Sequence, residues 1–178
     1  LEKPMAINAS DLALLLSYYE NRKESDSPIL LTGFNRRFSP AMTEIKKSVQ
    51  NLSNPLIINY RMNAGHIPLD HWVHGHEGGG RNIGEACHIY DLFTYLIGRR
   101  VVSVTATAVS PKTDHYSSQD NFVATCAFED GSVATLTYTA MGSRDFPKEQ
   151  MEVFVDGKVW RMDDYKLLEQ VGGKSGGP

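Results

Sequence analysis

Three ionisable side chains have the types and the spacing that proton transfer requires. Glu85, His88 and Asp91 recur every three residues within one helical pattern, so they share one stripe of the helix surface. Histidine is the natural proton acceptor near neutral pH, and a carboxylate one turn away could fix the tautomer or orientation of its ring. The alternative is a core histidine that is hydrogen-bonded to backbone, with Asp91 in a structural ion pair.

Lys3 is a further candidate, in the run Glu2-Lys3-Pro4. An ammonium held beside a proline could orient a hydroxyl or carbonyl oxygen of a substrate, whereas the alternative is a solvated lysine. Arg36 and Arg37 follow Asn35 later in the chain. An arginine fork suits a phosphate or a carboxylate, although a surface pair with one salt bridge is an equally good interpretation.

The segment from Asn63 to Glu77 is a long loop that holds Trp72 and four of the six histidines. Loops of this length inside a domain are usually functional or mobile. Histidine and glutamate are zinc ligands, but the spacing here matches no zinc signature and the paired cysteines of structural zinc sites are absent. We therefore expect no metal site and interpret the loop as the polar mouth of a cleft. The side chains concerned are His66, His71, His74, His76 and Glu77.

Gly78-Gly79-Gly80 precede the helix that carries the acidic and histidine stripe. Glycines at a helix N-terminus can receive an anion, but a G-x-G-x-x-G motif after a strand and a Walker sequence are both absent. We expect these glycines to allow close packing or a sharp turn into the helix. The sequence also lacks a Gly-x-Ser-x-Gly elbow and a Cys-x-x-Cys pair, so nucleophilic and redox-thiol chemistry have no support.

The helix itself is predicted to follow the glycine run and to end at Gly98, which suits the C′ position. Apolar residues recur along it at helical spacing, so most of its surface is expected to be buried. These residues are Ile83, Cys87, Tyr90, Phe93, Leu96 and Ile97.

Two further helices and two strands are predicted before this helix, the second strand at 56–62. The first helix runs from Asp11 to about Arg22 with Ser10 as N-cap, and the second runs to Val49 from Ser39-Pro40, an N-cap followed by an N1 proline. Between them, the continuous apolar run 29–34 is typical of a buried strand. The side chains expected to face the core are Leu12, Leu15, Leu16 and Tyr19 in the first helix and Met42, Ile45 and Val49 in the second.

The second half of the chain is predicted to be mostly β. Strands are expected at 56–62, 101–109, 121–128, 133–139, 151–155 and 158–162. Asp130-Gly131 and Asp156-Gly157 are strong hairpin signals. The order of elements predicts an α+β fold with an open, largely antiparallel sheet and helices on one face. Such an open face is often an oligomer interface, because its apolar side chains need cover. Residues 171–178 are predicted to form a flexible tail.

Length and composition favour one ordinary globular domain. The chain has 178 residues, of which 41% are hydrophobic and 22% charged. A net charge of -3 makes nucleic acid an unexpected partner, and no apolar run has the length of a membrane span. Cys87 and Cys126 are interpreted as buried thiols of a reducing compartment, which favours the cytoplasm. The chain starts without Met, which suggests an excised fragment.

Taken together, these features resemble the Gfo/Idh/MocA family of NAD(P)-dependent oxidoreductases. The order and spacing of the motifs carry the resemblance over almost the whole chain. The sequence of residues 79–88 most resembles that of a subgroup in which this module is attached to a zinc-type alcohol dehydrogenase domain. The matching segments are Glu2-Lys3-Pro4, Phe34 to Pro40, Trp72, Gly78 to Gly80, the helix residues Gly84, His88, Asp91 and Leu92, and the hairpin Asp130-Gly131-Ser132.

The resemblance implies a substrate and oligomerisation domain with the dihydrodipicolinate-reductase-like fold. In the family a Rossmann domain precedes the Glu-Lys-Pro motif and supplies the dinucleotide fingerprint. That domain is absent from this chain, which would therefore be inactive alone. NAD or NADP would be bound mainly by the absent domain, with Glu2, Lys3 and Pro4 at its edge. The expected partners are a carbohydrate substrate and a second copy of the chain.

The resemblance also implies roles for individual residues. Lys3 would contact the substrate and the nicotinamide ribose, His88 would be the general base or acid, and Asp91 would support the helix. Many relatives carry an Asp four residues before the histidine, where this chain has Gly84. Lys3 and His88 therefore act as a pair, or Glu85 substitutes from another angle. The residues expected to contact the substrate are Arg36, Trp72, Arg81 and Asn82.

The function implied is hydride transfer between nicotinamide and a sugar, a nucleotide sugar or a cyclic polyol. The alternative is a non-catalytic module that binds sugar or holds an oligomer together. The departure at Gly84 favours that alternative, because a triad of Lys3 and His88 with an aspartate is incomplete here.

Overall fold

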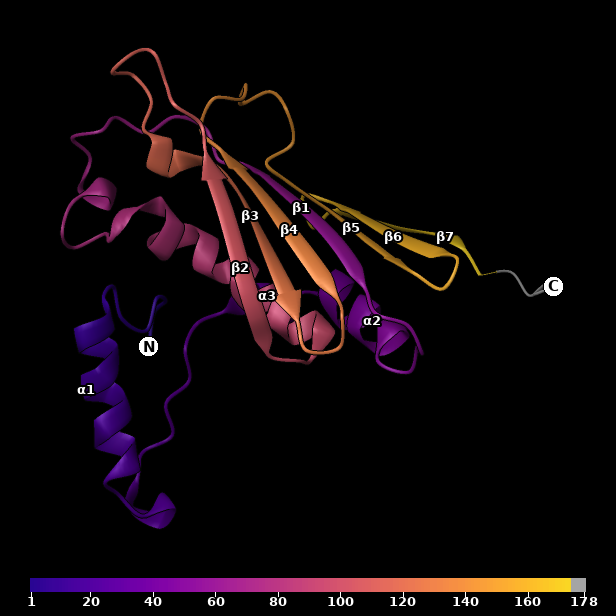
Figure 1. Ribbon diagram of the computed structural model, residues 1–178, viewed down its shortest axis with the longest axis horizontal. Helices are drawn as coiled ribbons and strands as arrows, with labels where there is room; N and C mark the ends of the chain where they lie inside the picture. Colours follow the sequence, from indigo (N-terminus) through magenta and orange to yellow (C-terminus); the bar gives the residue numbers. More distant parts are fainter. Residues whose placement is uncertain (174–178) are drawn as a thin grey trace.

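A seven-stranded sheet forms the body of the molecule in the computed structural model, which describes residues 1–173 (Figure 1). The strand order is β2-β3-β4-β1-β5-β6-β7. Only β1 and β4 run parallel, and the other neighbouring pairs are antiparallel. The predicted α+β class with an open, largely antiparallel sheet is confirmed. The strands are β1 (Ile57–Asn63), β2 (Val101–Ala108), β3 (Asn121–Phe128), β4 (Val133–Thr139), β5 (Glu149–Val155), β6 (Lys158–Asp163) and β7 (Leu167–Gly172).

Alternation along the central strands gives the sheet one buried face. In β1, the side chains of Ile58, Tyr60 and Met62 are buried, while Ile57 and Asn59 face outward. This period of two follows from the pleat of a strand, which turns successive side chains to opposite faces. The same alternation runs through β3, β4 and β5. The buried faces of these strands meet two helices and form the core.

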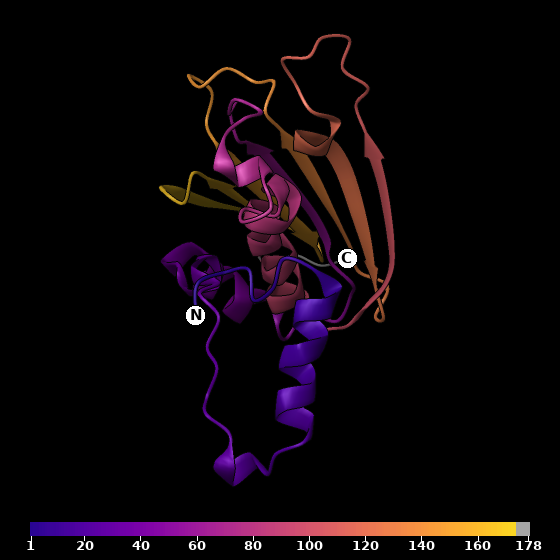
Figure 2. The ribbon, with the colours of Figure 1, turned by 90° about the vertical axis from the view of Figure 1, so that its left-hand side faces the viewer.

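Two of the three α-helices, α2 (Pro40–Val49) and α3 (Cys87–Ile97), cover this buried face (Figure 2). The Ser39 hydroxyl accepts a hydrogen bond from the Met42 amide, and Pro40 occupies the first turn of α2. These features confirm the predicted start of this helix. Its predicted core stripe is also confirmed, because Met42, Ile45 and Val49 are buried.

Gly98 ends α3 as predicted, in the left-handed conformation (φ 71°) with its amide donating to the Thr94 carbonyl. The predicted burial pattern is only partly right. Phe93 and Leu96 are buried, but Ile83 is 38% exposed and Ile89 and Leu92 are fully buried instead. Cys87, Tyr90 and Ile97 are half-buried.

The reason is a π-helical turn, Asn82–Ala86, that leads into α3. A π-turn holds more residues than an α-turn. A pattern counted at 3.6 residues per turn through Ile83 therefore loses register with the helix that follows.

The N-terminal elements stand away from the sheet. The predicted first helix forms, but its cap, its core contacts and the strand expected after it were predicted wrongly. The first helix, α1 (Ala9–Glu20), begins one residue earlier than its proposed cap, because the Asn8 side chain accepts from the Asp11 amide at 2.8 Å. No residue of α1 is buried. The expected strand 29–34 does not form, and Ile29 is 98% exposed.

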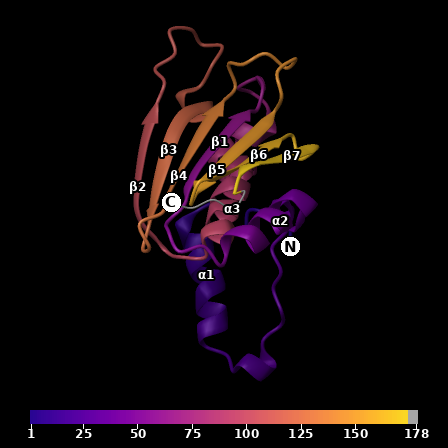
Figure 3. The same cartoon turned by 90° about the vertical axis from the view of Figure 1, so that its right-hand side faces the viewer.

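The cause is visible in the arrangement of the chain, where α1 and the segment after it project from the end of the sheet (Figure 3). None of the seven strands pairs with residues 29–34. This segment instead exchanges backbone hydrogen bonds with Leu1, whose N-terminus donates to the Leu31 carbonyl and whose carbonyl accepts from the Gly33 amide, both at 2.9 Å. The apolar side chains therefore face outward.

Strand β7 was missed by the sequence analysis. Val171 and Gly172 belong to this strand and not to the predicted tail. Polar residues and glycine gave the segment little strand character, but β6 provides its edge and pairs with it antiparallel from Lys158 to Asp163. The remaining tail residues 174–178 lie outside the described residues.

The outer face of the sheet differs from the apolar face that the oligomer prediction assumed. Polar side chains such as Thr137 and Glu152 lie between scattered apolar ones such as Ile57 and Val123. Homo-oligomerisation therefore stays a prediction. Both cysteines are free thiols, with Cys126 buried and Cys87 half-buried. Among residues 1–173, no helix combines the length and apolar character that crossing a bilayer needs.

Leu92→Ala should lower the free energy of unfolding of this chain by about 2–5 kcal/mol, because Leu92 is fully buried between α3 and the sheet. Leu14→Ala is the matched control, since Leu14 is also a helical leucine but is 69% exposed, and it should change stability by about 0.5 kcal/mol or less. Urea unfolding measures both. Equal losses in the two variants would contradict the described packing of α3.

Candidate functional site

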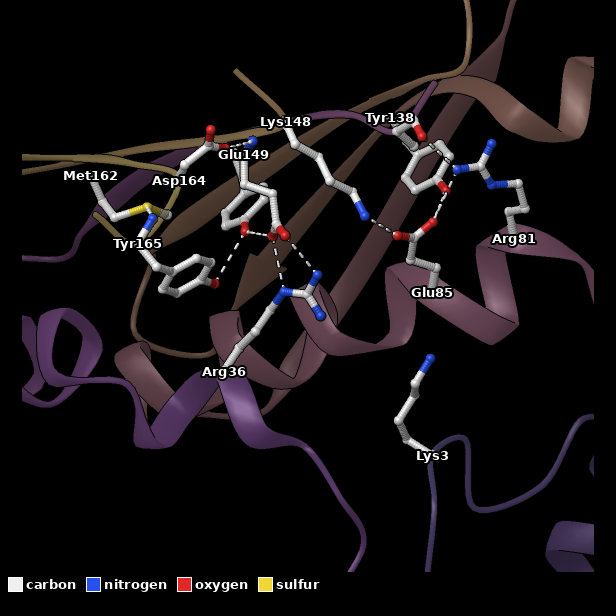
Figure 4. A network of polar contacts seen from close by, with 12 residues as sticks. Lys3, Arg36, Arg81, Glu85, Tyr138, Lys148, Glu149, Met162, Asp164 and Tyr165 are labelled. Atoms are coloured by element: carbon white, nitrogen blue, oxygen red, sulfur yellow. Dashed lines mark hydrogen bonds and ion pairs between the residues drawn. The ribbon is translucent and has the colours of Figure 1, made fainter. Parts of the chain in front are cut away.

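Lys3 and His88 meet at the start of α3. The Lys3 ammonium donates a hydrogen bond to the carbonyl oxygen of Gly84, inside the π-helical turn. Figure 4 shows the Lys3 side chain pointing toward the helical segment that carries Glu85. His88 lies one turn further on, and its ring packs edge-on against Phe34, with centroids 6.0 Å apart. The residues that begin the chain and those that follow the segment 29–33 are thus both brought to this turn.

His88 is held as a neutral imidazole. Burial lowers its pKa, and the positive charges of Arg36 and Lys3 lower it further, to about 4. Its Nδ1 atom is buried and has no hydrogen-bond partner among the described residues. A neutral ring at pH 7 can accept a proton, which is the property that the sequence analysis looked for at this position.

The Arg36 side chain forms an internal ion pair. Its guanidinium forms a fork with the Glu149 carboxylate, at 2.9 Å (Nε to Oε2) and 2.8 Å (Nη2 to Oε1). Tyr60 also donates to Glu149, and its hydroxyl lies 3.1 Å from that of Tyr165. This saturated pair supports the site, and it leaves the predicted substrate contact of Arg36 without support.

The Glu85 carboxylate is also fully engaged in hydrogen bonds and ion pairs within the protein. It accepts from Lys148 Nζ at 2.8 Å, from Tyr138 Oη at 2.5 Å and from Arg81 Nη2 at 3.1 Å (Figure 4). Burial alone would raise the pKa of Glu85, but the bonds from Lys148 and Tyr138 and the nearby charges lower it to about 2. A carboxylate that stays ionised among three donors suits an anchor better than the proton acceptor considered for this position.

Arg81 is the most buried cation of this cluster, with 2% of its surface exposed. Besides Glu85, it donates to the carbonyls of Gly65 at 2.6 Å and of Ala64 at 3.1 Å. It therefore ties the long loop after β1 to the turn before α3. These contacts do not support the substrate contact predicted for Arg81.

Asp91 makes the structural ion pair that was left open as its alternative role. Both carboxylate oxygens accept from Arg37, and the guanidinium of Arg37 also lies over the ring of Tyr95, 5.2 Å from its centroid. The carboxylate does not bond to His88, so it fixes α3 against residues 35–38 and leaves the histidine ring free.

Asn82 and Trp72 lie on the surface. The Asn82 side chain accepts from the Tyr90 hydroxyl at 2.9 Å and lines an apolar groove of about 690 Å³ between α3 and strands β2 and β3. Trp72 is 63% exposed beside His71. Glu2 is exposed and Pro4 half-buried, on either side of Lys3. Among the described residues, none of these four makes a hydrogen bond, an ion pair or an aromatic contact with His88.

The loop histidines do not converge on one point. His66 stacks on His115, with ring centroids 3.9 Å apart, His71 accepts from the Val73 amide, and His74 lies 3.7 Å from the Asp120 carboxylate. In the part of the chain that the structure describes, no three histidine, cysteine or acidic side chains are grouped as a metal would require.

Sequence reasoning missed the residues that complete the two ion clusters. Glu149 begins β5 and Lys148 directly precedes it, whereas Tyr60 lies in β1 and Tyr138 in β4. Their only signal was a polar group on a buried strand position, as with Tyr60, which must find a partner. Which partner it finds depends on strand order, and the parallel pairing of β1 with β4 had no local sequence signal.

Comparison with known proteins gives relatives of one kind. Myo-inositol 2-dehydrogenase of Thermotoga maritima is 27% identical over 141 residues, which is 76% of this chain and 40% of that protein. The oxidoreductase YrbE of Bacillus subtilis is 27% identical over 158 residues, which is 86% of this chain and 44% of that protein. The chain thus spans less than half the length of these curated relatives.

Among solved structures, one similar to this chain is the WlbA dehydrogenase of Bordetella pertussis in complex with NADH and UDP-GlcNAcA. The match has a TM-score of 0.78 at 15% sequence identity, and it includes 99% of this chain and 55% of the WlbA chain. The WlbA dehydrogenase shares the fold. A family model described as the GFO/IDH/MocA C-terminal domain matches residues 54–158, which is more than half of the chain. The chain therefore belongs to the GFO/IDH/MocA C-terminal domain family.

Proposed function

We propose that this chain is the substrate-binding half of an oxidoreductase that transfers hydride between NAD or NADP and a sugar, a nucleotide sugar or a cyclic polyol. The observation that carries the proposal is the meeting of Lys3 and His88 at one turn of α3, an ammonium beside a neutral imidazole. This pair has the two properties that oxidation of an alcohol needs from a protein, a proton acceptor and a positive charge.

In the proposed mechanism His88 accepts the proton of the reacting hydroxyl group. Lys3 donates to the same oxygen and stabilises the negative charge that develops there. A nicotinamide held beside this pair would supply the redox chemistry as the hydride acceptor. Arg36 and the Glu85 cluster act indirectly, because their ion pairs hold the elements that carry Phe34, Gly84 and His88.

The described residues fit the edge of a nicotinamide site and not the whole of it. Lys3 is half-exposed and already oriented beside His88, which suits contact with a nicotinamide ribose. A dinucleotide fingerprint is absent from the sequence. We therefore propose that a nucleotide-binding domain joined to Glu2-Lys3-Pro4 holds the rest of the cofactor.

Two observations support such a domain. The curated relatives are more than twice as long as their matched part. In addition, α1 and the segment after it expose apolar side chains that a second domain would cover, among them Leu14, Ile29 and Leu31, at 69%, 98% and 71% exposure.

The relatives also support a carbohydrate-like substrate, since one is named for myo-inositol and another was solved with UDP-GlcNAcA. The proposal of a fusion to a zinc-type alcohol dehydrogenase domain rests on the sequence of residues 79–88 alone. The full-length coding sequence would test it. Self-association of the chain and a cytoplasmic location are likewise proposals from the sequence. A non-catalytic carbohydrate-binding module is the second candidate, favoured by Gly84.

His88→Ala in the full-length protein should lower kcat/KM for nicotinamide reduction by about 10²- to 10⁴-fold, because the proton acceptor is lost. Cofactor binding should persist, since the proposed nucleotide-binding domain would hold most of the cofactor. Turnover is measured on panels of sugars, nucleotide sugars and cyclic polyols, and cofactor binding by nicotinamide fluorescence.

His76→Ala is the matched control, because His76 is an exposed loop histidine; it should keep wild-type kcat/KM. Full turnover in His88→Ala would move the base to another residue. Bound cofactor without turnover on any panel in the wild type would favour the non-catalytic module.

The acid limb of the pH profile of kcat/KM should lie near pH 4, well below the ordinary histidine value of 6.5. The sign follows from the role of His88, since the neutral ring is the active form and protonation below its pKa removes the base. Rates are measured from pH 3.5 to 7, with re-assay at pH 7 to correct for unfolding. A limb near 6.5 would show that His88 is not desolvated in the working enzyme.

A further inference from the structure

The π-helical turn before α3 presents a backbone oxygen to Lys3. Gly84 lies at the centre of this turn, and its carbonyl accepts from the Lys3 ammonium. π-turns are rare and occur frequently at functional sites. Here the turn lies one helical turn before His88, so the carbonyl, the ammonium and the imidazole form one local group.

The shape of this turn depends on having glycine at position 84. A Cβ atom built there would lie 2.9 Å from the carbonyl oxygen of Gly78. Gly78 cannot give way easily, because a Cβ at that position would itself lie 2.3 Å from the Val73 carbonyl oxygen. The backbone of residue 78 thus lies close to residue 73 on one side and to residue 84 on the other. A side chain at 84 would therefore shift the backbone of the turn, and with it the carbonyl that Lys3 uses.

We propose that Gly84 is a positioning residue, whose carbonyl holds the Lys3 ammonium beside His88 and gives it a neutral backbone partner in place of a carboxylate. The catalytic meaning of this contact rests on the proposed function, whereas the contact itself does not. It predicts that the effect of Lys3 on His88 depends on the integrity of the turn.

The charged groups around His88 show why the hydrogen bond between Lys3 and Gly84 matters for the charge at the imidazole. Lys3 and Arg36 face the ring as cations, Glu149 and Glu85 face it as anions, and the Cys87 thiol adjoins Lys3. Glu149 is bonded to Arg36, and Glu85 to Lys148 and Arg81. A carbonyl dipole offsets a cation far less than a carboxylate does. The charge of Lys3 therefore acts on His88 and on a reacting oxygen at nearly full strength.

The contact is tested first by NMR on this chain, without any assay of activity. In Lys3→Met, the carbonyl ¹³C resonance of Gly84 should move upfield because it loses its hydrogen bond. The carbonyl resonance of Gly157, in the distant β5–β6 turn, should stay unchanged. An unchanged Gly84 resonance would overturn the proposal, and this variant keeps the glycine, so its folding does not depend on the crowded turn.

The positioning role is tested by a double-mutant cycle in the full-length protein. Gly84→Ala and Lys3→Met should each lower kcat/KM by about 10²-fold, and the double variant should lose no more than either alone. Both single variants should move the acid limb of the pH profile upward, because the charge that lowers the pKa of His88 is displaced or removed. A role of Gly84 in folding alone would not move the limb.

Gly157→Asn is the control, since nothing lies within 4 Å of a Cβ at this exposed turn and asparagine tolerates its left-handed conformation (φ 72°); it should keep wild-type rates. Additive losses in the double variant would overturn the positioning role. If no substrate is turned over, the proposed function fails while the Gly84 resonance still decides the contact.

Discussion

The ion cluster at Glu85 fixes the turn before α3 to the end of the sheet, and the positions of Gly84 and His88 depend on it. A half-buried carboxylate is costly unless donors replace its water. Arg81 supplies a donor from the residue before the π-helical turn, Tyr138 from β4, and Lys148 from the residue directly before β5. The three elements are therefore locked in one arrangement, with Gly84 and His88 turned toward Lys3.

Charge neutralisation within the surrounding pairs determines the electrostatics at His88. Arg36 is matched by Glu149 and Arg37 by Asp91. Lys148 and Arg81 share one carboxylate, so this cluster keeps one positive charge. Lys3 adds a second one against a carbonyl. The site is thus net positive around a buried imidazole, which explains why the ring is neutral and why a developing negative charge on a substrate would be favoured.

Local signals in the sequence predicted the elements far better than their partners. The Ser39-Pro40 start of α2, the Gly98 end of α3 and the two Asp-Gly hairpins each depend on a few adjacent residues, and all were found. The failures depend on distant neighbours: the segment 29–34 has apolar strand character but no strand beside it, and β7 has little character but a partner edge. In the candidate site, Lys3 and His88 were proposed from residue type and motif, whereas the contacts of Glu149 and Tyr138 could be known only from the strand order.

Lys3 connects the candidate site with the exposed N-terminal surface. Its ammonium is anchored at Gly84, and its backbone is anchored through Leu1, which pairs with the exposed segment at Leu31 and Gly33. A side chain holds catalytic geometry only when the element that carries it is itself supported. A domain that covers α1 and this segment would therefore bring a cofactor and would also rigidify the backbone from which Lys3 reaches His88.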